Sequence, residues 1–341
     1  MTDPVPRDSF YVQWHILDRC NLRCRHCYQD DFSRGREMDW SRLKYAADNL
    51  LQTMQTWGTR LDAALTGGEP FLKPELLTLL QYLDNSPQVG NLSIISNGTV
   101  FPEYARQLPR LSKISEIRVS LDGISPETND AIRGKGVLDK VKVNIARWRD
   151  LGLPVTVMFT VMKGNRSEIP RLIEFGKSLD LAAIIIERFF PLGRGEEIQT
   201  DALNGNEFLQ VWQDILAQVE ITADPADLIS YRAIRLDFDR PDEVDVLGSG
   251  CVVAKDGLAI LPDATLLPCR RFTLPIGNLM EQSLDEIWRK SPVLEALRDK
   301  TRLKGKCGRC EIDDCFGCRA MCYCLEKDYL AGDPHCWIFS D

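Results

Sequence analysis

Three cysteines near the N-terminus have a spacing that could hold iron. Cys20, Cys24 and Cys27 lie within "CNLRCRHC", which gives the pattern C-x3-C-x2-C. A [4Fe–4S] cluster normally takes four cysteine thiolates. Three thiolates from one short loop would bind three irons and leave the fourth open to a small ligand. Half of a zinc ribbon is the alternative, since C-x2-C pairs also occur in zinc sites.

The other cysteines gather at the opposite end of the chain. Nine of the twelve follow residue 250 of the 341-residue sequence, which has only three histidines. The N-terminus lacks the basic start and apolar stretch of a signal peptide, so we expect a cytoplasmic protein. In a reducing compartment, clustered thiols indicate metal binding rather than disulfides. The scarcity of histidine favours all-thiolate sites, with four-thiolate zinc as the alternative.

Charge and hydropathy exclude two broad classes of function. The formal net charge of −8 argues against a nucleic-acid-binding protein, which usually carries a basic excess. No apolar run approaches the ~20 residues of a membrane span. We therefore expect neither nucleic acid nor membrane as a partner.

Short apolar strands alternate with amphipathic helices over roughly the first 220 residues. This alternation predicts an α/β fold with a parallel sheet and outer helices. Six strand–helix units are fewer than the eight of a closed barrel, so we expect a partial (β/α)6 barrel. The predicted strands are 11–17, 61–70, 91–99, 114–123, 154–165 and 182–193, and the helices are 38–57, 73–83, 136–152, 167–180 and 206–220.

The domain boundary is predicted in the acidic stretch 235–250, which contains proline and glycine. The barrel would span 1–235, and a small cysteine-rich domain would span 236–341. That second domain shows little helical periodicity beyond 283–300, so we expect metal sites to stabilise it. At the barrel mouth, the cysteine loop should meet residues 67–70 and other turns at strand ends.

The pattern C-x3-C-x2-C after a first strand resembles the radical SAM superfamily. The resemblance implies that the amino and carboxylate groups of S-adenosylmethionine (SAM) bind the open iron of a [4Fe–4S] cluster. It also implies reductive cleavage of SAM to a 5′-deoxyadenosyl radical, which abstracts hydrogen from a substrate. A flavodoxin or ferredoxin would supply the electron. No residue stands out in the sequence as a catalytic acid or base.

Two turns at strand ends match the family's SAM-binding motifs. "GGEP" (Gly67, Gly68, Glu69 and Pro70) resembles the segment that binds the methionine amino group. Glycines allow close backbone approach, and Glu69 either accepts from the ammonium or orders the turn. "SNG", with Ser96 and Asn97, resembles the segment near the ribose and carboxylate.

Further SAM contacts follow from the same resemblance, each with a structural alternative. Ser120 and Asp122 of "SLDG" match a segment that reaches the ribose hydroxyls, although Asp122 could instead cap a turn. His26 replaces an aromatic residue near adenine, and a surface histidine is the alternative. Tyr28 would support adenine or pack under the loop. Arg188 would pair with the SAM carboxylate or form a structural ion pair with Glu187.

The C-terminal cysteines resemble the SPASM domain, which holds two auxiliary [4Fe–4S] clusters. We assign Cys251, Cys269 and either Cys318 or Cys322 to the nearer cluster, and leave Cys324 spare. The outer cluster would use Cys307, Cys310, Cys315 and Cys336. Structural zinc sites and a single-cluster "twitch" variant are the alternatives.

Two features of the cysteine-rich segment depart from the SPASM pattern. The glycine that the pattern expects five residues before its second cysteine is Ala264 here, and only four residues separate Cys310 from Cys315.

The substrate is predicted from the family alone. SPASM relatives modify peptides or proteins by crosslinking, epimerisation or oxidation, so we expect a peptide or protein substrate. Only 19 residues precede Cys20, so either a separate partner would bind a leader peptide or the substrate would bind directly. A tetrapyrrole is the alternative, since close cousins decarboxylate haem precursors; a non-catalytic Fe–S or zinc protein is a third class. The basic stretch 289–306 would receive an acidic peptide or form a solvated helix face.

Overall fold

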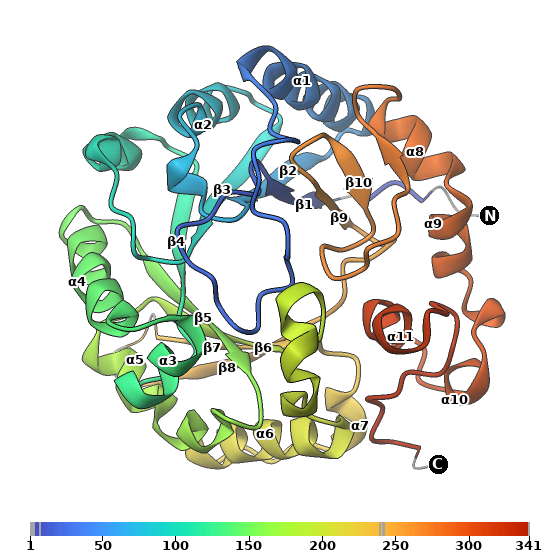
Figure 1. The fold of residues 1–341 in the computed structure, drawn as a ribbon. Helices are drawn as coiled ribbons and strands as arrows, with labels where there is room; N and C mark the ends of the chain where they lie inside the picture. Colours follow the sequence, from blue (N-terminus) through green and yellow to red (C-terminus); the bar gives the residue numbers. More distant parts are fainter. Residues whose placement is uncertain (1–3, 7, 239, 241–242, 340–341) are drawn as a thin grey trace.

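Six parallel strands form the centre of the computed structural model, which describes residues 4–6, 8–238, 240 and 243–339. They pair in chain order, each with the next. Figure 1 shows them curving around a centre, with helices on the outside. The predicted partial (β/α)6 barrel is therefore confirmed. The strands are β1 (Ser9–His15), β2 (Arg60–Thr66), β3 (Val89–Ser96), β4 (Ile114–Ser120), β5 (Val155–Val161) and β6 (Ala183–Arg188).

The outer helices are mostly those that the periodicity predicts. They are α1 (Trp40–Trp57), α2 (Leu76–Asp84), α3 (Pro126–Arg133), α4 (Val137–Asp150), α5 (Leu172–Ser178), α6 (Gly205–Gln218) and α7 (Pro225–Leu228). For α1, Asp39 accepts from the N–H of Arg42 at the start, and Gly58 ends the helix with φ 68°.

Four 3-10 helices lie among these elements: η1 (Pro70–Leu72), η2 (Glu103–Arg110), η3 (Arg166–Arg171) and η4 (Gly193–Asp201). The third strand–helix unit has only η2, which contains Pro109 and follows Pro102. Proline removes a backbone donor, so an α-helix is disfavoured there. The helix predicted at 167–180 is split in the same way, into η3 with Pro170 and α5.

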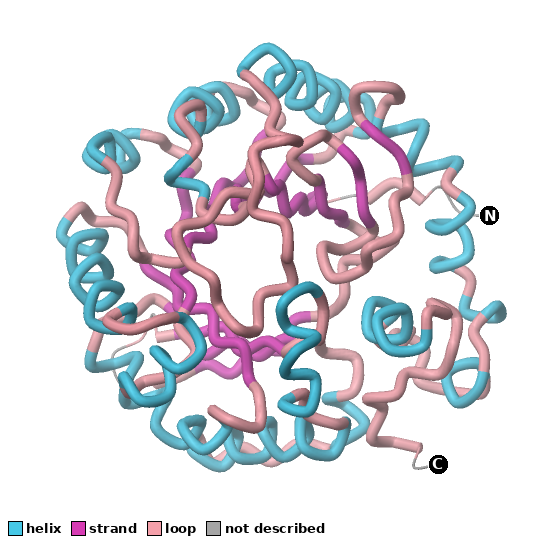
Figure 2. Tube along the Cα trace, in the orientation of Figure 1, coloured by secondary structure: helices cyan, strands magenta, loops and turns pink. Residues whose placement is uncertain are grey.

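Strands that follow the barrel extend the sheet at both edges. β7 (Ala233–Asp237) and β8 (Asp245–Ser249) add antiparallel strands beside β6. β9 (Gly257–Ile260) pairs in parallel with β1, and β10 (Thr265–Leu267) and β11 (Gly277–Asn278) follow it. One eleven-stranded sheet thus crosses the predicted boundary between 235 and 236, and Figure 2 shows its curved, open course. Residues 239, 241 and 242 of the predicted linker lie outside the described residues.

The C-terminal part adds four short α-helices beside the barrel (Figure 1). They are α8 (Leu284–Lys290), α9 (Pro292–Arg298), α10 (Gly305–Gly308) and α11 (Arg319–Glu326), with η5 (Lys300–Arg302) between α9 and α10. Trp288 of α8 packs edge-on against Phe10 of β1, with ring centroids 5.0 Å apart. One hydrophobic core therefore includes residues from both predicted domains. Within the described part of the chain, no helix is long and apolar enough to cross a membrane.

Candidate functional site

The three N-terminal cysteines lie at the mouth of the barrel, immediately after β1. Cys20, Cys24 and Cys27 line one cavity with about 1000 Å³ of empty space that opens to solvent. Burial, together with the nearby Asp122, Cys27 and Cys20, raises the pKa of Cys24 to about 11 against the opposing charge of Arg133. Burial likewise raises the pKa of Cys20 and of Cys27. The thiols are thus protonated without iron, and binding of a cluster must displace their protons.

The "GGEP" turn fixes the cysteine loop through its backbone. The N–H of Gly68 donates to the Leu17 carbonyl at 2.9 Å, and the N–H of Glu69 donates to the Arg19 carbonyl at 2.8 Å. A Cβ atom on Gly68 would collide with the carbonyl oxygens of Asp18 and Arg19. The glycine is therefore required by the close approach of two chain segments.

The Glu69 side chain joins this turn to the next strand end. Its carboxylate is fully buried and accepts from the Ser96 hydroxyl at 2.9 Å and from the Asn97 N–H at 2.8 Å. Asn97 in turn donates to the Asn21 side chain at 2.8 Å and lies 3.5 Å from the Cys20 sulfur. Glu69 was predicted either to accept from the SAM ammonium or to order the turn. Its contacts in the structure are those that order the turn. Gly67, Gly68, Ser96 and Asn97 line the cavity itself.

Asp122 holds the middle of the cysteine loop rather than pointing into the cavity. Its buried carboxylate lies 2.7 Å from His26 Nε2 and 2.6 Å from Arg133 Nε, and it accepts from the Thr160 N–H at 2.8 Å. Burial raises the pKa of Asp122, but Arg133 and His26 outweigh it and hold the pKa well below its usual range. Arg133 also lies 4.0 Å from the Cys24 sulfur. The predicted contact of Asp122 with ribose stays a prediction.

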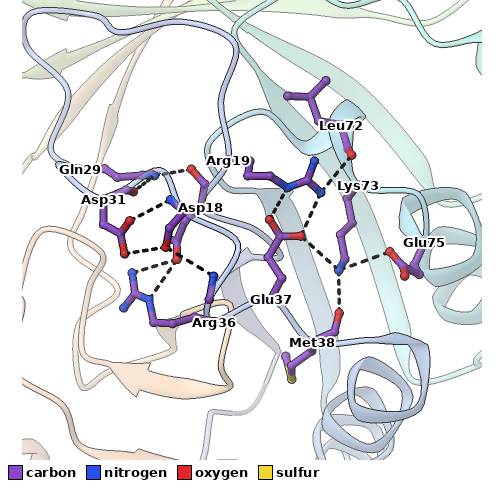
Figure 3. Close-up of polar contacts among 12 residues, drawn as sticks. Asp18, Arg19, Gln29, Asp31, Arg36, Glu37, Met38, Leu72, Lys73 and Glu75 are labelled. Atoms are coloured by element: carbon purple, nitrogen blue, oxygen red, sulfur yellow. Dashed lines mark hydrogen bonds and ion pairs between the residues drawn. The ribbon is translucent and has the colours of Figure 1, made fainter.

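A second network of ion pairs joins the residues on either side of the cysteine loop (Figure 3). Arg19 pairs with Glu37 at 2.5 Å, and the buried Lys73 lies 3.7 Å from the same carboxylate. Asp18 pairs with Arg36 at 3.0 Å. The segment after the third cysteine is thereby tied back to the residues before the first.

Four other predicted contacts occupy different parts of the site. Ser120 and Tyr28 line the cavity, and Tyr28 lies under the Arg270 guanidinium, 4.5 Å from ring centroid to Cζ. Arg188 also borders the cavity, but its guanidinium packs over Phe208 at 4.1 Å. Pro70 starts η1 and is buried. The charge interactions of Arg188 are with Arg232 and Asp333 and, more weakly, with Cys318 and Cys315, and Glu187 instead pairs with Arg271.

Four C-terminal cysteines line a second, smaller cavity of about 340 Å³. They are the four predicted for the outer cluster: Cys307, Cys310, Cys315 and Cys336. Arg319 Nη2 donates to the Cys307 sulfur at 3.3 Å, and the Asp333 N–H donates to it at 3.2 Å. Such donors stabilise thiolate charge, so this donor set fits a four-thiolate cluster.

The remaining C-terminal cysteines divide into two kinds. Cys251, Cys269 and Cys318 interact electrostatically with one another, which is the set predicted for the nearer cluster if Cys318 is its third member. The Cys322 thiol donates to the Ala331 carbonyl at 3.6 Å, and the Cys324 thiol donates to the Pro191 carbonyl at 3.6 Å. Cys322 and Cys324 also interact electrostatically with Cys318, so the assignment of Cys318 or Cys322 to the nearer cluster stays a prediction.

Ala264 occupies the position where the SPASM pattern has glycine. Its φ is 70°, in the left-handed region that favours glycine. Alanine thus occupies a backbone conformation that ordinarily favours the glycine of the pattern. Among the described residues, no three His, Cys, Asp or Glu side chains are grouped as the ligands of a single ion.

Comparison with known families identifies the chain. The family described as "Radical SAM superfamily" matches residues 14–176, and the family described as "Iron-sulfur cluster-binding domain", SPASM, matches residues 251–311. The chain belongs to the radical SAM superfamily. It is an enzyme with a SPASM domain, and the resemblance predicted from its motifs is confirmed. Its cofactors are SAM, a SAM-binding [4Fe–4S] cluster and SPASM auxiliary clusters; the predicted two are consistent with this match.

Two kinds of curated relative resemble this radical SAM enzyme. The AdoMet-dependent heme synthase of Methanosarcina barkeri is 28% identical over 95% of both chains. The protein of the same name from Nitratidesulfovibrio vulgaris is 26% identical over 95% of this chain and 91% of the relative. The GTP 3′,8-cyclase of Bradyrhizobium diazoefficiens is 32% identical, but only over 57% of this chain and 58% of the relative.

Solved structures share the fold at low sequence identity. Streptococcus suis SuiB bound to the precursor peptide SuiA has a TM-score of 0.72 and 16% identity, over 96% of this chain and 75% of SuiB. Native anSMEcpe with bound AdoMet has a TM-score of 0.69 and 16% identity, over 95% of this chain and 93% of that structure. These likenesses show the arrangement of barrel and C-terminal domain.

Several charged residues near the cysteines could not be predicted from the sequence. Arg232, Arg319 and Asp333 contact the C-terminal cysteines, yet no spacing rule links them to those cysteines. Arg133 approaches the Cys24 sulfur from a position 109 residues later in the chain, so local spacing gives no signal of that contact. Helix α11 was also missed, because its cysteines and arginine obscure the apolar periodicity.

Proposed function

We propose that this radical SAM enzyme abstracts hydrogen from a tetrapyrrole that carries carboxylate side chains, such as a haem precursor. The observation that carries the proposal is the match to AdoMet-dependent heme synthases over 95% of this chain, through both the barrel and the cysteine-rich part. The GTP 3′,8-cyclases match over a much smaller share. The favoured substrate thus differs from the peptide expected first from the sequence.

The cavity lining supports an anionic, flat substrate. The charged side chains that line it, apart from the thiols and His26, are Arg133, Arg188, Arg271 and Glu187. Arg133 pairs with Asp122 and Arg271 pairs with Glu187, so Arg188 provides the remaining positive charge. Tyr28, Phe32 and Phe189 line the same cavity and offer flat apolar surfaces. Arg271 lies at the end of β6 beside Glu187, and a substrate carboxylate could compete for its guanidinium.

The chain's own residues would position the reaction. Cys20, Cys24 and Cys27 would hold the SAM-binding cluster, and the two cavity-lining turns at 67–68 and 96–97 would hold the methionine end and ribose of SAM. When bound, the cluster and SAM supply a 5′-deoxyadenosyl radical that removes a hydrogen atom from the substrate. Loss of carbon dioxide and one further electron would then convert a propionate to a vinyl group, with that electron leaving through the C-terminal domain.

The C-terminal thiols complete the proposal. Cys251, Cys269 and Cys318 would bind the nearer auxiliary cluster, and the four cysteines around the 340 Å³ cavity would bind the outer one. A flavodoxin or ferredoxin would reduce the SAM-binding cluster, as the family resemblance implies. The domain division at 235–236 is retained as part of this proposal.

The test is a binding and product assay with the anaerobically reconstituted enzyme. An iron-loaded porphyrin with free propionates should bind with a shift of its main absorption band and, with SAM and reductant, lose carbon dioxide. The same macrocycle with esterified propionates should not bind. Arg271→Met should weaken binding roughly tenfold, whereas Arg149→Met, on a surface pair with Asp180, should not. Absence of any binding to the free porphyrin would overturn the proposal.

A peptide substrate is the second candidate, because SuiB, which shares the fold, is solved with a precursor peptide. The basic stretch 289–306 gives it no further support. Several of its cations pair with nearby acids, among them Lys290 with Glu286 and Lys304 with Asp328. That pattern agrees with the solvated helix face. New crosslinks or mass changes on a co-expressed short peptide, with no change to the porphyrin, would favour this candidate.

A further inference from the structure

Two buried charged side chains and a third, partly buried one lie between the two groups of C-terminal cysteines. Arg188 is the last residue of β6 and is 6% exposed; Asp333 lies in the C-terminal segment and is 3% exposed. Arg232 precedes β7 and is partly buried. We call these three residues the Arg188–Asp333–Arg232 group. It joins the barrel to the SPASM domain.

Arg188 is the member whose charge lacks a direct partner. Among the described residues, none accepts a hydrogen bond from its Nε, Nη1 or Nη2. Its guanidinium instead packs over the rings of Phe208 at 4.1 Å and Trp337 at 5.5 Å. Burial and the nearby Arg232 lower its pKa to about 10, whereas Asp333, Cys318 and Cys315 act in the opposite direction. A buried unpaired cation is costly, so this position calls for a nearby anion.

Asp333 contacts both cysteine groups. Its carboxylate accepts from the N–H of Cys318 at 2.6 Å, in the group of Cys251 and Cys269. Its own N–H donates to the sulfur of Cys307, in the outer group, at 3.2 Å. The carboxylate also accepts from the N–H of His335 at 2.9 Å. Burial raises the pKa of Asp333, but Arg232 and Arg188 outweigh it and lower the pKa. The carboxylate is therefore charged at neutral pH.

Arg232 likewise reaches both groups. Its Nη2 donates to the Cys315 sulfur at 3.7 Å, and its Nη1 donates to the Ile229 carbonyl at 2.7 Å. Burial raises the pKa of Cys251 to about 11, and the charge of Arg232 acts to lower it. The same guanidinium thus influences one cysteine of each predicted cluster.

We propose that the Arg188–Asp333–Arg232 group balances the charge of the two auxiliary clusters and sets their reduction potentials. Reduction adds one negative charge to a cluster that its thiolates already make anionic. A fixed cation nearby stabilises the reduced form and raises the potential, and a fixed anion lowers it. Arg188 extends this influence from the barrel mouth, so that electron acceptance by the SPASM domain depends on a barrel residue. The inference rests on the assignment of the auxiliary clusters and not on the identity of the substrate.

The test is an anaerobic redox titration of the reconstituted holoenzyme, followed by electron paramagnetic resonance without substrate. Arg188→Met should lower the auxiliary potentials, so that the reduced-to-oxidised ratio at a fixed potential falls about tenfold, or 59 mV for one electron. Asp333→Asn should shift them in the opposite direction. The SAM-binding cluster, recognised by its response to SAM, serves as the internal reference for Asp333→Asn, because Asp333 does not line the barrel cavity, whereas Arg188 does.

A matched control distinguishes the effect of a buried charge on the potentials from the effect of any nearby charge. Arg309→Met removes the same charge beside Cys310, but Arg309 is exposed to solvent, so screening should leave the potentials almost unchanged. Arg188→Lys, which keeps the cation, should also preserve them. Iron content is measured for every variant, and Arg188→Gln replaces Arg188→Met if the latter loses iron.

Three results would overturn the proposal. Unchanged potentials in Arg188→Met and Asp333→Asn at full iron content are the first. Shifts of the same sign in both variants are the second, since they would indicate general disturbance of the fold. The third is weaker substrate binding by Arg188→Met with unchanged potentials, which would assign Arg188 to the substrate. Because the titration contains no substrate, failure of the proposed tetrapyrrole chemistry would leave its outcome intact.

Discussion

The three N-terminal cysteines and four of the C-terminal cysteines of this enzyme line cavities of very different size. Three thiols at the barrel mouth line an open cavity of about 1000 Å³ together with polar turns from neighbouring strands. Four thiols near the C-terminus line about 340 Å³ with few other polar groups. The first arrangement leaves room for a ligand beside a cluster, whereas the second supplies every ligand from the protein. The difference separates a reactive site from a site suited to electron transfer.

The two regions nevertheless share one arrangement of charged side chains. Each has a buried carboxylate next to an arginine that approaches a cysteine sulfur: Asp122 with Arg133 at the barrel, and Asp333 with Arg232 in the SPASM domain. At the barrel the carboxylate also holds His26, from within the cysteine loop. Charged side chains therefore position thiols in both regions. The regions differ mainly in the space that each leaves for a ligand beside its cysteines.

The largest expected effect comes from removing one thiol at the open site. Cys24→Ala should bring production of 5′-deoxyadenosine below detection, because the cluster that reduces SAM would lose one of only three protein ligands. Iron should fall from about twelve to about eight per chain. Cys324→Ser, whose thiol contacts a carbonyl rather than a cavity, should change neither quantity. Full SAM cleavage by Cys24→Ala would remove the distinction between the two regions.

Removing one thiol from the smaller, C-terminal cavity should leave the cleavage of SAM unchanged. Cys310→Ser should cost about four irons per chain, since it opens the four-thiolate set around the smaller cavity. Uncoupled cleavage of SAM should continue at a similar rate, because the barrel keeps its own thiols. Iron analysis and the 5′-deoxyadenosine assay measure both quantities. An equal loss of cleavage in Cys310→Ser would mean that the two sites do not act separately.

A smaller effect tests the carboxylate that holds the open loop. Asp122→Asn should lower the free energy of unfolding of the iron-free protein by about 3 kcal/mol, because it leaves buried Arg133 without its charged partner. Anaerobic urea denaturation measures this change. Asp180→Asn, which alters a pair whose carboxylate is 77% exposed, should have little effect. Equal stability of both variants would show that the buried pair is no stronger than a surface one.

The smallest expected effect concerns Ala264, which stands where the SPASM pattern has glycine, between β9 and β10. Ala264→Gly should change the free energy of unfolding by less than about 0.5 kcal/mol. Glycine relieves the left-handed backbone at φ 70°, but it also removes a fully buried methyl group, and the two terms are of similar size. Urea denaturation again provides the measurement. A gain well above that range would show that alanine strains this turn.

The sequence predicted the parts of this molecule that depend on local spacing. The cysteine loop, the "GGEP" and "SNG" turns and the alternation of strands and helices each occupy a short stretch, so their pattern is visible without a structure. The role of Glu69 could not be fixed, since its partners Ser96 and Asn97 are strand neighbours rather than sequence neighbours. The direction of Arg188 was equally hidden, because Phe208 and Trp337 come from distant segments.

The pairing of β9 with β1 has a consequence for how the enzyme is made. β1 delivers the cysteine loop, yet Tyr11–Trp14 lie beside Gly257–Ile260, about 245 residues later in the chain. On the ribosome, β1 therefore remains an unpaired edge on one side until most of the protein has been synthesised. Closing such a distant contact is slow. During that interval the strand that carries the cysteine loop lacks one of its two neighbours, so its pairing is completed only late in synthesis.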